Sequence, residues 1–122
     1  MSTTVGSRQH RMTFTYVLAG QVVTDLALAE PWYRSLFDRE PDARPMAGLL
    51  EWHLSGGSGV QVWQDPDRAG HSSVVLGSDD LDTEALRLTA GGLEHGGPEP
   101  GGGARLLRLM DPDGNSVVLL GE

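Results

Sequence analysis

The sequence contains no cysteine and no lysine, and aromatic residues make up only 6% of its 122 residues. Without cysteine the chain cannot form disulfides, thiolate metal ligands or a cysteine nucleophile, and without lysine it cannot form a Schiff base with a carbonyl substrate. Several classes of catalytic chemistry are therefore excluded before any motif is considered.

Long apolar runs are also missing. No segment approaches the roughly 20 apolar residues of a membrane span, and the opening MSTTVGSRQH lacks the apolar stretch of a secretory signal. Seventeen acidic residues against nine arginines give a formal net charge of −8. This charge repels nucleic acids and anionic membranes. We therefore expect a soluble, cytoplasmic protein with neither as a partner.

The sequence repeats itself with a shift of about 55 residues. VVTDLALAEPWYRSLF, from Val22, is echoed by LGSDDLDTEALRLTAG, from Leu76, and LEWHLSGGSGVQVW, from Leu50, is echoed by LRLMDPDGNSVVLL, from Leu107. Each copy has the pattern of a strand, a helix and a glycine-containing hairpin. The length fits one domain. We predict an α+β fold of two tandem βαβββ modules.

The module boundaries follow from the pattern of each copy. We expect a flexible tail over residues 1–12 and a single domain over 13–122, with modules at about 13–68 and 71–122. The first module begins with a strand from Thr13 to Thr24 and a helix capped by Thr24 or Asp25. Its buried helix face carries Leu26, Ala29, Tyr33, Leu36 and Phe37. The second repeats this order with a strand over His71–Ser78, a helix over Leu81–Ala90 and a glycine-rich connector through Gly103.

Strand alternation predicts which hairpin residues face the helices. If Leu54 pairs with Val60, an apolar face forms that contains Leu50, Trp52, Leu54, Val60 and Val62. Glu51, His53, Gln61 and Trp63 then share the opposite face, a mixture typical of a small-molecule pocket. In the second hairpin, pairing of Met110 with Ser116 places Leu107, Leu109, Val117 and Leu119 under the helix and leaves Leu106, Arg108, Met110, Ser116 and Val118 on the other face.

The repeated βαβββ plan, the segment DLALAEPWYRSLF and the terminal DPDGNSVVLL resemble the vicinal oxygen chelate superfamily, which includes glyoxalase I, extradiol dioxygenases, fosfomycin-inactivating transferases and bleomycin-resistance proteins. The resemblance covers nearly all of the chain after residue 12. It implies that the two curved sheets form a cup and that two chains form a homodimer. Fold in this group says little about the reaction.

The resemblance also implies where a divalent metal would be held. The family histidine positions correspond to Leu18 and Ser73, and the family glutamate positions to Gln61 and Val118. An amide and a hydroxyl are the only donors among these four side chains, whereas such an ion needs three or four good donors. We therefore expect neither a metal, another cofactor nor a catalytic residue.

A cup with an apolar and aromatic wall and no metal favours capture of a ligand over chemistry. The resemblance points to proteins that sequester bulky, partly aromatic antibiotics, with Trp63 as a stacking surface and Arg108 as a group that orients a carbonyl-rich ligand. Trp52 is included although its face favours a core position. The predicted ligand-binding residues are Tyr16, Leu18, Glu51, Trp52, His53, Gln61, Trp63, His71, Ser73, Arg108, Met110 and Val118.

Two other functions remain open at this point. The chain could be a metal-dependent glyoxalase- or dioxygenase-type enzyme that uses His53, His71 and Glu51 as unconventional ligands. It could instead be a partner-binding module, in which case side chains should fill the cup.

Overall fold

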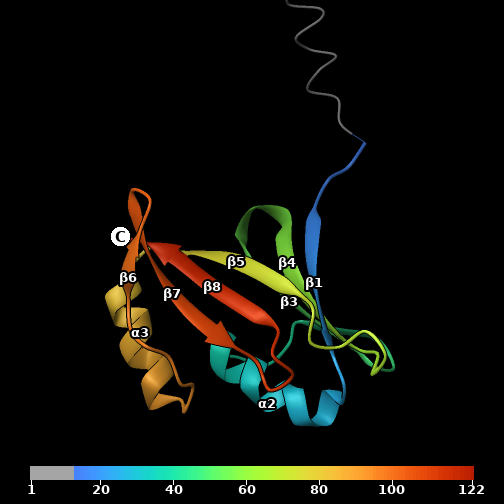
Figure 1. Cartoon of the computed structure of the whole chain (residues 1–122). Helices are drawn as coiled ribbons and strands as arrows, with labels where there is room; N and C mark the ends of the chain where they lie inside the picture. The colour runs from blue at the N-terminus through green and yellow to red at the C-terminus, as the bar shows by residue number, and fades with distance from the viewer. Residues whose placement is uncertain (1–12) are drawn as a thin grey trace, which may run out of the picture.

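The computed structural model describes residues 13–122, and the tail predicted over 1–12 lies outside the described residues. Two βαβββ modules follow one another, as predicted (Figure 1). The first contains β1 (Val17–Val23), α2 (Leu26–Phe37), β2 (Ala43–Met46), β3 (Leu49–His53), a short 3-10 turn (Ser55–Gly57) and β4 (Ser58–Gln64). The second contains β5 (Ser73–Ser78), α3 (Leu81–Ala90), β6 (Glu99–Gly101), β7 (Ala104–Met110) and β8 (Ser116–Gly121). The α+β class is confirmed.

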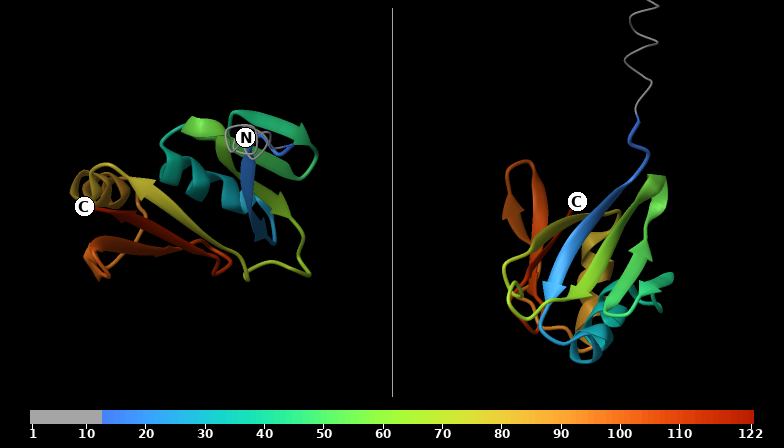
Figure 2. Two further views of the ribbon diagram at one scale, coloured as in Figure 1. Left: turned by 90° about the horizontal axis from the view of Figure 1, so that it is seen from above. Right: turned by 90° about the vertical axis from the view of Figure 1, so that its right-hand side faces the viewer.

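Each module forms a four-stranded mixed sheet with the same topology. The strand orders are β1-β4-β3-β2 and β5-β8-β7-β6. In each sheet the first strand pairs in parallel with the last, and the other pairs are antiparallel. Strands β1 and β5 form the neighbouring edges of the two sheets (Figure 2).

The two helices begin at side-chain caps, and each buries one apolar face. The Asp25 carboxylate accepts a hydrogen bond from the backbone N–H of Ala27 at 2.9 Å, and Asp80 does the same for Thr83 at 3.1 Å. Ala29, Tyr33 and Leu36 are buried on α2, and Leu81, Ala85 and Leu88 are buried on α3. Helical spacing in the sequence therefore identified the core face of α2.

Both modules share one hydrophobic core. It contains apolar residues of α2, α3 and the helix-facing sides of both sheets. Trp52 is fully buried there, with its ring centroid 5.2 Å from that of Phe37 and 6.2 Å from that of Tyr33. The helices are also tied together directly, because the guanidinium of Arg87 on α3 donates to the backbone carbonyls of Ser35 and Leu36.

A buried polar network joins the modules at the carboxyl end of β1. The Tyr33 hydroxyl donates to Asp111 at 2.7 Å, and the Asn115 amide donates to Asp111 and to the Val22 carbonyl, each at 2.7 Å. Burial and the neighbouring Asp111 carboxylate both raise the pKa of Tyr33. The loop predicted only as a turn, DPDGN, therefore also holds the second module against the first.

The hairpin faces are confirmed, but one register differs from the prediction. Val60 pairs with Trp52 rather than with Leu54. The Leu54 N–H donates to the Ser58 carbonyl at 2.8 Å. The turn therefore contains only Ser55–Gly57, whereas pairing of Leu54 with Val60 would have left all of SGGSG in the turn. Gly56 and Gly57 allow this turn because both have positive φ angles. The shift is two residues, so the side chains within β3 and β4 stay on their predicted faces. The prediction is wrong for Leu54, which follows β3 at the start of the turn and is 36% exposed instead of facing the core. In the second hairpin Met110 pairs with Ser116, as predicted.

The first strand of each module is shorter than expected. Strand β1 begins at Val17 rather than Thr13 because its partner β4 begins at Ser58, directly opposite Val17. In the second module Ser73 lies opposite Ser116, the first residue after the DPDGN turn, so His71 stands outside the strand. In both modules the hairpin turn sets where parallel pairing can begin.

The glycine-rich connector predicted through Gly103 contains a short strand, β6. Over residues 13–122, neither helix has the length and apolar character needed to cross a membrane.

Candidate functional site

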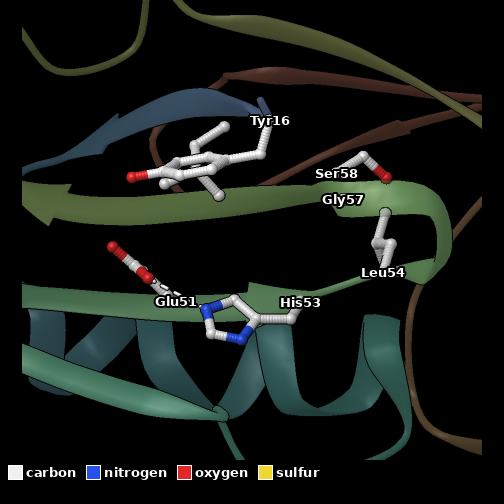
Figure 3. Close-up of a pocket in the computed structure, with 7 residues that line it drawn as sticks. Tyr16, Glu51, His53, Leu54, Gly57 and Ser58 are labelled. Atoms are coloured by element: carbon white, nitrogen blue, oxygen red, sulfur yellow. Dashed lines mark hydrogen bonds and ion pairs between the residues drawn. The ribbon is translucent and has the colours of Figure 1, made fainter. Parts of the chain in front are cut away.

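A hydrogen-bonded group of three side chains occupies the outer face of the first sheet. Glu51 and Gln61 are direct cross-strand partners on β3 and β4. The Gln61 amide donates to Glu51 Oε2 at 2.8 Å, and His53 Nε2 lies 3.0 Å from Glu51 Oε1 (Figure 3). The residues on either side of Glu51 in the chain, Leu50 and Trp52, point to the core. Strand alternation therefore gathers this polar group opposite the core.

The backbone of His53 is fixed from behind the group. Its N–H donates to Asp42 Oδ2 at 2.6 Å, and its carbonyl accepts from the Arg39 guanidinium. Arg39 also donates to Asp42 Oδ1 at 2.6 Å. The hydrogen bond from the His53 N–H, together with that from Arg39, lowers the pKa of Asp42. This ionised pair keeps the end of β3 in place, and with it the imidazole.

Glu51 is held as a carboxylate. Hydrogen bonds from His53 and from Gln61 lower its pKa from the ordinary value. Its side chain is only 14% exposed, so most of the charge faces protein groups and the adjoining cavity rather than bulk water. At neutral pH the group therefore consists of one negative charge, one imidazole and one amide.

A cavity of about 390 Å³ adjoins this group. Tyr16 lies across the opening from Glu51 and His53 (Figure 3). Four of the predicted residues meet here, and the turn after β3 supplies three that were not predicted. The lining consists of Tyr16, Leu18, Glu51, His53, Leu54, Gly57 and Ser58. The SGGSG motif marks the position of these turn residues in the sequence, but glycine and serine in a turn predict only a tight connection between strands and not a cavity wall.

A second, smaller cavity of about 220 Å³ lies toward the other end of the same sheet. Gln61 and Trp63 contribute to its lining together with Met46, Leu49 and neighbouring residues. The Arg68 guanidinium lies 5.5 Å from the centroid of the Trp63 ring, within cation–π distance. The predicted stacking surface on Trp63 therefore already has one cationic neighbour.

Two of the predicted residues lie on the outer face of neither sheet. Trp52 is fully buried and donates from Nε1 to the Arg39 carbonyl at 3.0 Å, so it packs in the core and does not line the cup. The prediction that Trp52 binds ligand was wrong, because its side chain points to the same sheet face as that of Leu50 and not to the face of Glu51. His71 is exposed in the loop before β5 rather than on a strand.

The remaining predicted residues lie on the outer face of the second sheet. Ser73 on β5 and Met110 on β7 both pair with Ser116 on β8, and Arg108 pairs with Val118. Arg108 forms an exposed ion pair with Glu99 at 3.1 Å. The face is mostly apolar, and Met110 is 68% exposed. The cavity beside Glu51, by contrast, is lined by the first module alone.

The residues present do not suit the divalent metal of the superfamily. Leu18 and Val118 offer no donor atoms, Ser73 offers a hydroxyl, and the Gln61 amide already bonds to Glu51. The unconventional set also fails to assemble, because within residues 13–122 no three histidine, aspartate or glutamate side chains are grouped closely enough to hold an ion. Glu51 and His53 meet, but His71 does not join them.

Comparison with solved structures gives clear matches. A glyoxalase/bleomycin resistance protein from Catenulispora acidiphila is 30% identical, with a TM-score of 0.82 over 89% of this chain and 99% of that one. TnmS3, an antibiotic binding protein from Streptomyces sp. CB03234, is 24% identical, with a TM-score of 0.76 over 91% and 98%. A lactoylglutathione lyase from Agrobacterium tumefaciens is 19% identical, with a TM-score of 0.71 over 91% and 95%. No family model and no curated protein matches the sequence.

Proposed function

Because the chain belongs to the glyoxalase/bleomycin resistance proteins of the vicinal oxygen chelate superfamily, we propose that it is a cytoplasmic binding protein that sequesters a bulky, partly aromatic antibiotic or related natural product without a metal or other cofactor. The observation that carries this proposal is the cavity of about 390 Å³ beside Glu51, which joins an aromatic ring, aliphatic side chains and a few fixed polar groups. Such a composition is typical of small-molecule sites. The structural similarity to an antibiotic binding protein supports the same function.

Binding without conversion is the testable content of this proposal. Calorimetry with a glycopeptide of the bleomycin type, a mitomycin and an enediyne should show saturable binding of at least one compound, and mass spectrometry should recover that compound unchanged. A Tyr16→Ala variant should bind more weakly, because Tyr16 lines the cavity and is 66% exposed. Removal of Phe14, which is also exposed but does not line this cavity, is the matched control. Failure of every compound to bind, or chemical conversion of the bound one, would contradict the proposal.

We further propose that the protein works as a homodimer. The outer face of the second sheet exposes Val75, Met110 and Leu120, which are 62%, 68% and 40% accessible. Neighbouring apolar side chains on one sheet face form the kind of patch that another subunit covers. Light scattering should give a dimer mass, and Met110→Lys should produce monomers. Leu86 is exposed on α3, away from this sheet face, so Leu86→Lys should leave the dimer intact. A monomeric wild-type protein would contradict this part of the proposal.

The alternative function is a metal-dependent enzyme of the same superfamily. The close approach of His53 to Glu51 supplies two potential ligands and favours this possibility, as does the structural similarity to a lactoylglutathione lyase. Elemental analysis of the purified protein distinguishes the two functions. Stoichiometric metal that is lost on His53→Ala substitution, together with turnover, would replace the binding function by this one. A partner-binding module with a filled cup is disfavoured by the cavity.

A further inference from the structure

The hydrogen-bonded group of Glu51, His53 and Gln61 offers mainly acceptors for further hydrogen bonds. Glu51 uses one lone pair on each oxygen to accept from His53 and Gln61, and each oxygen can accept again. The imidazole must donate from Nε2 to an ionised Glu51, so its Nδ1 is an acceptor when the ring is neutral. The Gln61 amide donates to Glu51 and retains its carbonyl oxygen. A ligand that enters this cavity therefore has to supply donors.

Among the described residues, no permanent cation balances the Glu51 charge. The chain has no lysine, and within residues 13–122 no arginine forms an ion pair with Glu51. The nearby Arg39 directs its guanidinium to Asp42 and to the His53 carbonyl instead. His53 is the only ionisable donor that contacts the carboxylate among the described side chains. This charge is 14% exposed and has no permanent cationic partner within residues 13–122, which favours a cation from outside.

The opposite wall of the cavity is apolar. Tyr16 offers a ring face, and Leu18 and Leu54 add aliphatic surface. In Figure 3 the Tyr16 ring lies across from the carboxylate. A ligand that fills about 390 Å³ would contact the ring and the aliphatic groups on one side and reach Glu51 on the other. Its flat or apolar body and its donor group must therefore be adjacent.

We propose, on the basis of the binding function above, that this cavity selects flat apolar molecules carrying a protonated amine, which donates to the Glu51 carboxylate while the apolar body lies against Tyr16. Carboxylate-bearing molecules of the same shape are rejected by Glu51. The ligand class is thus a cationic, partly aromatic amine. The Arg108 position in the second module does not provide the opposite preference, because Glu99 already pairs with its guanidinium.

Three anthracene probes that differ in one substituent test this preference by fluorescence titration. Their substituents at the same ring position are aminomethyl, hydroxymethyl and carboxyl, which give a cation, a neutral molecule and an anion at neutral pH. We expect the amine to bind at least about tenfold more tightly than the alcohol, and the acid to bind most weakly.

Two isosteric variants identify the group responsible. Glu51→Gln keeps the side-chain shape and should reduce the amine-to-alcohol preference to within about threefold, with little change in alcohol affinity. Glu40→Gln makes the same charge change at a 69% exposed glutamate paired with Arg34, and should keep the preference. Circular dichroism confirms that both variants fold.

The outcomes separate the inference from the function on which it rests. Alcohol binding without a preference for the amine, tighter binding of the acid, or a preference that survives Glu51→Gln overturns the inference and leaves the binding function standing. If the wild-type protein binds none of the three probes, the cavity does not accept flat apolar ligands and the inference fails, whereas the binding function is decided by the antibiotic titrations described above.

Discussion

The hydroxyl of Tyr33 provides a sharp test of how the two modules are held together. It is fully buried on α2 and donates to Asp111 in the DPDGN turn of the second module at 2.7 Å. Tyr33→Phe removes this single donor and keeps the ring that packs against Trp52 and Phe37. The substitution also removes the acceptor of a 3.3 Å hydrogen bond from the Gln21 amide, so it separates the two hydrogen bonds of the hydroxyl from the hydrophobic packing around the ring.

The expected cost is set by the charge and burial of the acceptor. A hydrogen bond to a charged group contributes about 1.5–3 kcal/mol, and a buried acceptor that loses its donor is not resolvated by water. Asp111 keeps the donors from Asn115 and from the Asp113 N–H, which limits the loss. We expect Tyr33→Phe to lower the free energy of unfolding by about 2 kcal/mol.

Urea unfolding followed by far-ultraviolet circular dichroism measures this loss. Tyr16→Phe removes the same atom from an exposed ring and should change stability by less than about 0.5 kcal/mol. A double-mutant cycle with Asp111→Asn should give a coupling energy of about 1 kcal/mol or more. If Tyr33→Phe costs no more than the control, the hydrogen bond does not hold the modules together and the reasoning is refuted.

Three further changes have defined outcomes. Trp52→Ala should destabilise by about 3–5 kcal/mol in thermal or urea unfolding, because the indole is fully buried, whereas Trp63→Ala, at a half-buried ring, should cost clearly less. Asp25→Ala removes the N-cap of α2 and should cost about 1 kcal/mol by the same assay. Hydrogen bonding from Arg44 lowers the pKa of Glu30, so the stability it contributes is fully present above the ordinary value of 4.5 and is lost as pH falls through the folded-state pKa. The stability difference between wild type and Glu30→Gln should accordingly be present at neutral pH and disappear in strong acid.

Periodicity predicted the parts of this fold that depend on one buried face. The helix over Leu81–Ala90 and the core face of both hairpins follow from apolar spacing alone, because burial of one face is the dominant energetic requirement of an amphipathic element. The same logic placed Glu51, His53 and Gln61 together on the outer face. It also predicted the core position of Trp52, whose side chain points to the opposite face from Glu51 and so cannot belong to the binding site.

Features that depend on contacts between distant segments were not predictable from local patterns. Asp111 and Asn115 belong to an ordinary turn motif, yet both are buried because the turn packs against β1 and α2. The contribution of Gly57 and Ser58 to the cavity likewise depends on how the turn lies beside Tyr16 and Leu18. Turn sequences specify backbone geometry, whereas the surface that a turn covers is set by tertiary packing.

The repeat itself shows where the two modules have diverged. Equivalent hairpin positions on the core side are apolar and buried in both copies: Leu50 and Leu107, Trp52 and Leu109, Val60 and Val117, Val62 and Leu119. Equivalent positions on the outer side differ in charge or polarity: Glu51 and Arg108, His53 and Met110, Gln61 and Val118. Packing constrains the first set in each module separately, so it cannot account for the differences in the second. Since the outer faces are not needed to build the core, they can diverge, and they have done so into a polar face beside the Glu51 cavity and a largely apolar face, which we propose a second subunit covers.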